Sequence, residues 1–335
     1  MALDIRNVYS DLRSEMKATA TGAFIRNESD RGVVRMMGGD ARDLLHRLST
    51  ASIAGLADGR NVETLLTNEK GRVIDALLVI GEPGGLLLLT SPGKAEEVRN
   101  WMEKYTIMED CTYDDQSAQY VQFTIDNVSS GDSDSLSGMQ LPDSGSGTRQ
   151  QLHGVDVTIH RYESVGGGGA RVLCAVEDAT QFWASCMAGH GLPVVGRHAY
   201  TLWRIERLLP AVGHELGERS NPLEAGADAA IDFRKGCFIG QEVIARLDSY
   251  DKVQRHPCRL RFTADATSIG VGAELFHEKT NAGFVTTIAF DPHADCSVGI
   301  GLVRNAYEDA GTILTCEGLT VEILSSRRYK RDNDM

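Results

Sequence analysis

The chain has 335 residues, of which 42% are hydrophobic and 24% charged, with 34 Lys and Arg against 47 Asp and Glu. This apolar content excludes a largely disordered chain, and the length favours two or three domains. The aliphatic runs are far shorter than the roughly 20 residues of a membrane-spanning helix, and the N-terminus shows no secretory or import signal. The net charge of −13 disfavours nucleic-acid binding by the surface as a whole. We therefore expect a cytoplasmic protein that binds no membrane.

The N-terminal part of the sequence predicts helices and antiparallel strands. An apolar stripe after Asp40 predicts a helix over 41–50, and Ser91 with Pro92 predicts the start of another. Strand-like runs, of which the first three predict an antiparallel meander, cover residues 62–66, 73–80, 86–90 and 120–125. Residues 128–150 are dominated by Ser, Gly and Asp, so we expect a flexible surface loop there.

The C-terminal half mixes helices and short strands. Residues 155–162 and 171–176 predict a hairpin around the glycine run 166–169, which lacks the spacing of a phosphate-binding loop. Helices are expected after Asp178 and over 197–208. Short strand-like runs then predict a small β-barrel or sandwich, and they cover residues 258–262, 282–290, 298–303 and 319–324.

The cysteines are scattered and show no metal-binding spacing. They are Cys111, Cys174, Cys186, Cys237, Cys258, Cys296 and Cys316. No CxxC pair occurs and no two histidines share helical ligand spacing, so we predict no metal site made by side chains alone. Most of these thiols should be reduced core residues.

Cys237 is the best candidate for a reactive thiol. It follows Arg234 and Lys235 and precedes a predicted helix over 241–247. Nearby cations and a helix N-terminus both lower the pKa of a thiol, which favours the nucleophilic thiolate. The alternative is a small core residue at a strand-to-helix turn.

The region around this thiol is locally basic. Residues 234–261 hold seven Lys and Arg against three acids, a local charge of 7 − 3 = +4 in a chain of net charge −13. An anionic ligand or a nucleic-acid backbone could dock there. The alternative is an ordinary solvated face.

Glu206 lies on a mostly apolar predicted helix, where a carboxylate needs a partner. Such a group can accept hydrogen bonds from the ring N–H and amino donors of a pterin-like heterocycle. The alternative is a salt bridge, and the arginines that could form it are Arg204, Arg207 and Arg234.

The segment 235–242 reads KGCFIGQE. It resembles the hallmark K-G-C-[FY]-x-G-Q-E of the YgfZ-type branch of the glycine-cleavage T-protein superfamily. The resemblance covers most of the chain, including residues 34–48, 66–75 (LTNEKGRVID), 202–206 and 221–226 (NPLEAG). Only the 128–150 loop and the last few residues have no counterpart.

The resemblance implies an α+β fold. It consists of a T-protein-like folate-binding α/β portion of two interleaved subdomains over 1–250 and a small C-terminal β-barrel over 251–335. It implies tetrahydrofolate or a derivative as cofactor, and iron–sulfur proteins, including tRNA-modifying ones, as clients for maturation or repair. Cys237 and Lys235 would act at the functional thiol. The folate would be held by Glu206, Arg234, Lys235, Gln241, Glu242 and Asn68.

Two other functions stay open. The first is a folate-dependent transferase of aminomethyl or methyl groups. T-proteins carry an acid about three positions before the aromatic residue that here is Trp101, and Val98 stands at that place, which disfavours aminomethyl transfer. The second is a direct tRNA binder, which the net charge of −13 disfavours.

Overall fold

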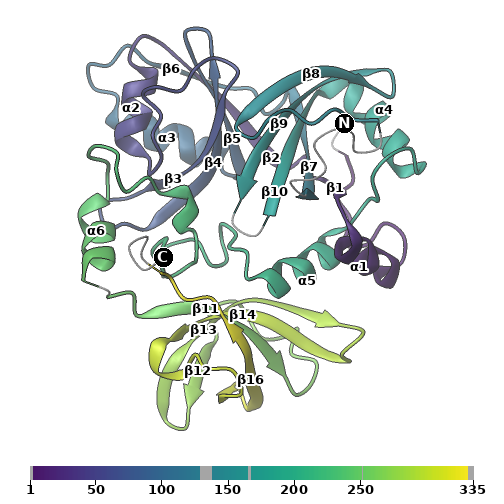
Figure 1. The fold of residues 1–335 in the computed structure, drawn as a ribbon, viewed down its shortest axis with the longest axis vertical. Helices are drawn as coiled ribbons and strands as arrows, with labels where there is room; N and C mark the ends of the chain where they lie inside the picture. The colour runs from purple at the N-terminus through teal and green to yellow at the C-terminus, as the bar shows by residue number, and fades with distance from the viewer. Residues whose placement is uncertain (1–2, 129–137, 165–166, 251, 331–335) are drawn as a thin grey trace. The chain divides into compact units, whose positions relative to one another are not determined.

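The chain forms two compact units, each assembled from segments that are distant in sequence. The computed structural model describes residues 3–128, 138–164, 167–250 and 252–330 (Figure 1). Unit 1 comprises Met1–Thr67, Asp75–Ala199 and Ala229–Ile239, and unit 2 comprises Asn68–Ile74, Tyr200–Asp228 and Gly240–Met335. The predicted α+β fold with a C-terminal barrel is confirmed. No helix among these residues is long and apolar enough to cross a membrane.

One sheet of unit 1 has the strand order β3-β4-β5-β2-β6. Its strands are β2 (Arg31–Met37), β3 (Asn61–Thr67), β4 (Val73–Glu82), β5 (Gly85–Pro92) and β6 (Thr112–Asp115). Strands β3, β4 and β5 confirm the predicted meander. Helices α2 (Ala41–Leu48) and α3 (Ala95–Tyr105) contact β5. Helix α3 begins later than predicted because Ser91 and Pro92 still belong to β5.

The second sheet of unit 1 has the order β1-β7-β10-β9-β8. Its strands are β1 (Phe24–Asn27), β7 (Tyr120–Val128), β8 (Ser146–Leu152), β9 (Val155–Ser164) and β10 (Gly167–Ala175). Helix α4 (Val176–Met187) covers one face, where the ring of Phe123 lies 4.9 Å from Phe182 and 5.4 Å from Trp183 between centroids. Helix α1 (Leu12–Thr21) precedes β1. The predicted hairpin is confirmed as β9 and β10, while residues 165–166 lie outside the described residues.

The predicted loop over 128–150 is partly wrong. Residues 129–137 lie outside the described residues, but Ser146–Leu152 form strand β8, which pairs with β9. Met139 and Leu141 are buried in the core of the second sheet. A strand at the edge of a sheet can be polar, because only its backbone must pair, and this explains why composition predicted a loop.

The two sheets of unit 1 pack on each other through a small apolar cluster. Val33, Leu78, Ile80, Leu87 and Leu89 of the first sheet meet Tyr162 and Leu173 of the second. The same face of the second sheet also carries buried polar residues, which include Gln122 and Thr124.

Unit 2 contains most of helix α5 (Arg197–Arg207), helix α6 (Gln241–Ser249) and a closed six-stranded barrel (Figure 1). The barrel order is β11-β14-β13-β12-β15-β16. Its strands are β11 (Arg255–Phe262), β12 (Glu274–His277), β13 (Thr280–Asp291), β14 (Cys296–Arg304), β15 (Ile313–Cys316) and β16 (Leu319–Ser326). Short 3-10 turns occupy Asp228–Ala230 and Asn305–Tyr307. The barrel closes around an apolar core that includes Leu260, Phe262 and Leu275.

Candidate functional site

The segment 232–239, which carries Cys237, is anchored near the C-terminal end of α2. The Asp232 N–H donates to the Thr50 carbonyl at 3.0 Å, and the Ile239 N–H donates to the Arg47 carbonyl at 3.0 Å. Both bonds belong to unit 1 and hold the segment at its two ends. The thiol is therefore presented from a fixed stretch of backbone.

Lys235 binds backbone carbonyls at the end of α2. Its Nζ donates to the carbonyls of His46, Ser49 and Ala51 at 2.5, 2.6 and 2.8 Å. The last carbonyls of a helix lack intrahelical partners and carry partial negative charge, so a buried ammonium satisfies them well. Burial lowers the pKa of Lys235 to about 8. The ammonium thus has a structural role, and its predicted action on the thiolate stays a prediction.

Cys237 differs from the other cysteines in its exposure. Its side chain is exposed, that of Cys111 is half-buried, and the remaining five are buried. Burial raises the pKa of the thiols of Cys111 and Cys186 to about 11 and that of Cys174 to about 12. The alternative of a core residue is wrong for Cys237. It is the thiol most available for chemistry.

His46 is a neighbour of this segment that the sequence did not reveal. Its Nδ1 accepts from the N–H groups of Ile53 and Ala54 at 3.1 and 3.4 Å, so the proton of the neutral ring is on Nε2. Burial and the charge of Lys235 lower the pKa of His46, which keeps it neutral. Its Nε2 lies 4.0 Å from the position of a Cβ on Gly236. A neutral imidazole N–H therefore faces the residue before the thiol.

In unit 2, the second glycine of the KGCFIGQE segment, Gly240, is required for steric reasons. Gly240 has φ +84° at the N-terminus of α6, and a Cβ there would lie 2.6 Å from the Asn68 carbonyl. The Asn68 Oδ1 accepts from the N–H groups of Lys70 and Arg72 at 2.9 and 3.0 Å, which shapes the turn that packs against Gly240. Asn68 therefore has a structural role in the turn, and its predicted contact with folate stays a prediction.

Helix α5 has one anchored face and one exposed face. Arg204 is buried and donates to the Glu215 carboxylate at 2.6 Å, whereas the Glu206 side chain is 60% exposed. The Glu206 carboxylate lies 3.6 Å from the guanidinium of Arg207. This ion pair is one of the salt bridges that the sequence left open as an alternative to a ligand. This exposed pair leaves the carboxylate accessible to a ligand.

The predicted site residues fall into two groups. Arg234, Lys235 and Cys237 belong to unit 1, and Arg234 is exposed. The group in unit 2 consists of Asn68, Glu206, Gln241 and Glu242. Gln241 begins α6, and Glu242 is exposed and pairs with Arg246 at 3.2 Å. Within the described ranges, no three His, Cys, Asp or Glu side chains are grouped to hold a metal ion.

Among the described residues, three of the seven Lys and Arg in the basic stretch 234–261 form ion pairs with acids. Arg246 binds Glu242, Arg255 binds Glu224 at 3.2 Å, and Arg261 binds Glu322. Glu242 is already counted in the local charge of +4, whereas Glu224 and Glu322 lie outside the stretch and lower the positive charge there. The solvated-face interpretation therefore explains these three arginines.

Comparison with known proteins places these features in a family. The family described as "GCVT N-terminal domain" matches residues 5–235. The chain is 28% identical over 343 residues to an aminomethyltransferase of Halalkalibacterium halodurans, covering 97% of this chain and 92% of that protein. It is 25% identical to a putative chloroplastic transferase of Arabidopsis thaliana, covering 90% of this chain and 69% of that protein.

A solved structure shows the same fold. The crystal structure of the glycine cleavage system aminomethyltransferase T from Bartonella henselae superposes with a TM-score of 0.75 at 20% identity, covering 95% of this chain and 91% of that one. The family match spans more than half of the chain. The chain therefore belongs to the family of the glycine-cleavage T-protein, the aminomethyltransferase-like GCVT family.

Proposed function

We propose that the protein binds tetrahydrofolate or a derivative and assists the maturation or repair of iron–sulfur enzymes, including tRNA-modifying ones. The observation that carries this proposal is the exposed thiol of Cys237 within the KGCFIGQE segment. A thiolate is both a nucleophile and a ligand of iron, and a fixed, exposed thiol can reach a client protein. The other six thiols are half-buried or buried.

Glu206 would hold the pterin ring of the folate. Its carboxylate is 60% exposed, and its cation, Arg207, is 3.6 Å away, so both oxygens can accept from ring N–H and amino donors. Arg204 and Glu215 fix the helix beneath it. An exposed carboxylate fits the N–H and amino donors of a pterin, and a bound folate would supply one-carbon or redox chemistry. Gln241 and Glu242, in the same unit as Glu206, are further polar groups proposed to contact it, and the contact predicted for Arg234 stays a prediction.

The second candidate is a folate-dependent transferase of one-carbon groups. It is favoured by the curated relatives, several of which are named aminomethyltransferases. Val98 is an apolar residue that is fully buried in α3, so it offers neither a polar group nor access to such a reaction. Turnover of methylene- or methyl-folate with a small amine or thioether substrate would support this candidate over the first.

Cys237→Ser should fail to restore iron–sulfur enzyme activity in a strain that lacks the protein. The substitution is small and exposed, so the stability should change by about 0.5 kcal/mol or less. The activities of radical and dehydratase iron–sulfur enzymes are measured in cells that carry each variant. Cys111→Ser, at a half-buried thiol, is the matched control and should restore these activities. Full rescue by Cys237→Ser would remove the thiol from the proposal.

A further inference from the structure

The loop between α3 and β6, in unit 1, carries two successive apolar side chains that point into solvent. Ile107 is 85% exposed and Met108 is 94% exposed, whereas the next value among the large hydrophobic residues that the structure describes is 67%, for Tyr250. A single exposed apolar residue is ordinary, but two in succession at this exposure offer apolar area that a second molecule can bury. We call Ile107 and Met108 the apolar tip.

Glu109 fixes the backbone of the apolar tip. Its carboxylate accepts from the N–H groups of Ile107 and Met108 at 2.9 and 3.1 Å, and from the guanidinium of Arg47 at 3.0 Å. The bond from Ile107 and those from Arg47 and Met108 lower the pKa of Glu109 to about 2, so it is ionised at neutral pH. A loop that is already held in place loses little conformational freedom on binding, which favours affinity.

Asp110 ties the base of the same loop to the start of α2. Its N–H donates to the Asp40 carboxylate at 2.8 Å, and its own carboxylate accepts from the Gly39 N–H at 3.0 Å. Gly38 has φ +134°, and a Cβ there would lie 1.9 Å from the Asp110 carbonyl oxygen, so glycine is needed for this approach. The apolar tip therefore projects from a base that is bonded to α2 at two places.

The surface around the apolar tip is acidic. Asp43 binds Arg47 at 3.0 Å, and the Glu103 carbonyl accepts from the N–H of Thr106 at the end of α3. Five acids and two cations surround the tip, a local charge of 2 − 5 = −3, and they are Asp40, Asp43, Glu103, Glu109 and Asp110 with Arg47 and Lys104. This rim repels anionic lipids and a second copy of a chain of net charge −13, and it attracts a basic surface.

Arg47 links the loop to the segment that carries Cys237. Its guanidinium binds Glu109, while its carbonyl accepts from the Ile239 N–H at 3.0 Å. All these residues belong to unit 1, and α2, with eight residues, is about 12 Å long. A typical protein–protein contact covers about 800 Å² on each partner, roughly 30 Å across. One docked protein is therefore large enough to span the distance from the apolar tip to the thiol segment.

We infer that the apolar tip docks the client protein, and that the client presents an apolar pocket rimmed by Lys and Arg. The inference rests on the proposed function for the identity of the client. Ile107 and Met108 would fill the pocket, and the acids around them would face its basic rim. The flexible, polarisable side chain of Met108 adapts to pockets of different shape, which suits a surface that serves several clients.

The first step of the test captures the partner. Met108 is replaced by the photoreactive residue benzoylphenylalanine in the full chain, in cells that lack the wild type. The same replacement at Val271, a turn residue of unit 2 that is 56% exposed, is the matched control. Irradiation should cross-link a protein at position 108 that is absent at position 271. Mass spectrometry identifies this protein, which is then purified.

The second step measures how tightly the purified partner binds. Ile107→Ser and Met108→Ser should each weaken binding about tenfold or more, because each removes an apolar side chain from the contact. Val271→Ser should bind as the wild type does. Binding to the wild type should weaken as salt is raised, and Glu103→Gln should weaken binding at low salt more than at high salt.

The third step follows the effect in cells. The double variant Ile107→Ser with Met108→Ser keeps the local charge and removes only exposed groups, so it should melt at the wild-type temperature and bind tetrahydrofolate equally well. It should nevertheless lower the rescued iron–sulfur enzyme activities about tenfold or more, in parallel with its loss of affinity for the client.

The outcomes separate this inference from the proposed function. Full rescue by the double variant, or equal binding of the captured protein to it and to the wild type, would overturn the docking role and leave the proposed function intact. Cross-links at position 108 that match those at 271, or that reach only lipid or a second copy of the chain, would also overturn it. Absence of folate binding by the wild type would overturn the proposed function, while tip-dependent, salt-sensitive binding of the captured protein would still support the docking surface.

Discussion

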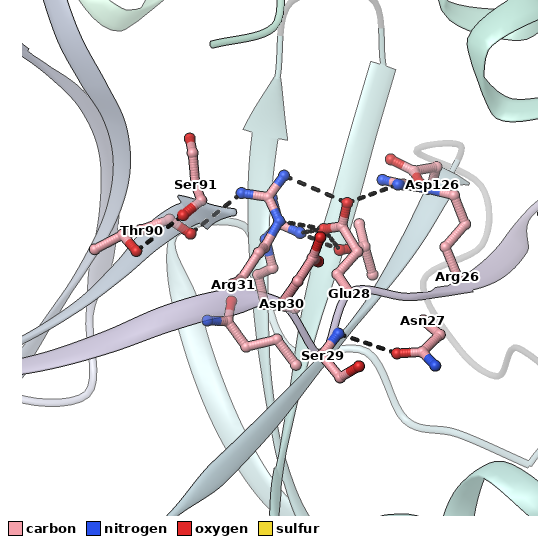
Figure 2. Close-up of polar contacts among 12 residues, drawn as sticks. Arg26, Asn27, Glu28, Ser29, Asp30, Arg31, Thr90, Ser91 and Asp126 are labelled. Atoms are coloured by element: carbon pink, nitrogen blue, oxygen red, sulfur yellow. Dashed lines mark hydrogen bonds and ion pairs between the residues drawn. The ribbon is translucent and has the colours of Figure 1, made fainter. Parts of the chain in front are cut away.

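Glu28→Ala should destabilise the folded chain by about 3–5 kcal/mol. Glu28 is buried and forms ion pairs with Arg26, which is also buried, and with Arg31 and Arg171, whose side chains are 16% and 13% exposed, so its removal takes a counter-charge from three poorly solvated cations (Figure 2). The pair between Arg26 and Asp126, at 2.6 Å, does not involve Glu28 and would survive. Denaturant unfolding measures the loss. Glu97→Ala, at an exposed residue of α3, is the control and should change stability by about 0.5 kcal/mol or less.

The same residue makes stability depend on pH. Burial opposes ionisation of Glu28, but the three arginines outweigh it and hold its pKa well below the usual range. A carboxyl with a lowered pKa in the folded state stabilises the protein above the unfolded-state pKa, near 4.5, and this stabilisation is lost as the pH falls. The wild type should therefore lose stability more steeply than Glu28→Ala below about pH 4.5. Parallel acid-unfolding curves would contradict this assignment.

Glu215→Ala should cost unit 2 a similar amount, about 3–5 kcal/mol. The Glu215 carboxylate is buried and accepts from Arg204 at 2.6 Å and from the hydroxyls of Thr286 and Thr287 at 2.6 and 2.7 Å. Burial opposes ionisation, but Arg204 and the hydroxyls lower the pKa of Glu215. Without the carboxylate, a buried guanidinium loses its counter-charge.

A double variant provides the control for this pair. Arg204→Met with Glu215→Leu removes both charges and replaces them with apolar groups of similar size, so it should cost much less than the sum of the two single changes. The free energy of unfolding of the three variants gives the coupling between the two residues. Additive losses would show that the ion pair does not hold α5 to the barrel.

The sequence predicted those elements whose signal is local. The apolar stripe of α2 and that of α5 give helices at Ala41–Leu48 and Arg197–Arg207, close to the expected bounds. The exposed position of Cys237 also agrees with its polar surroundings in the sequence. Periodicity and capping act over a few residues and can be read without the fold.

The features that the sequence missed depend on distant contacts. Lys235 binds carbonyls that lie 184–189 residues earlier in the chain, so its structural role could not be read from its neighbours. His46 is also far in sequence from the thiol segment, so its position beside Gly236 could not be predicted either. Polar edge strands such as β8 likewise depend on the sheet that receives them.

The most direct test of the proposed function is a calorimetric titration of tetrahydrofolate into the ligand-free protein at neutral pH. The wild type and Glu218→Gln, a variant at an exposed residue of unit 2, should bind equally. Glu206→Gln should bind at least about tenfold more weakly, because a charged acceptor of pterin donors is lost. Binding of the wild type with this loss at Glu206 supports the account. No binding by the wild type, or equal binding by Glu206→Gln, would contradict it.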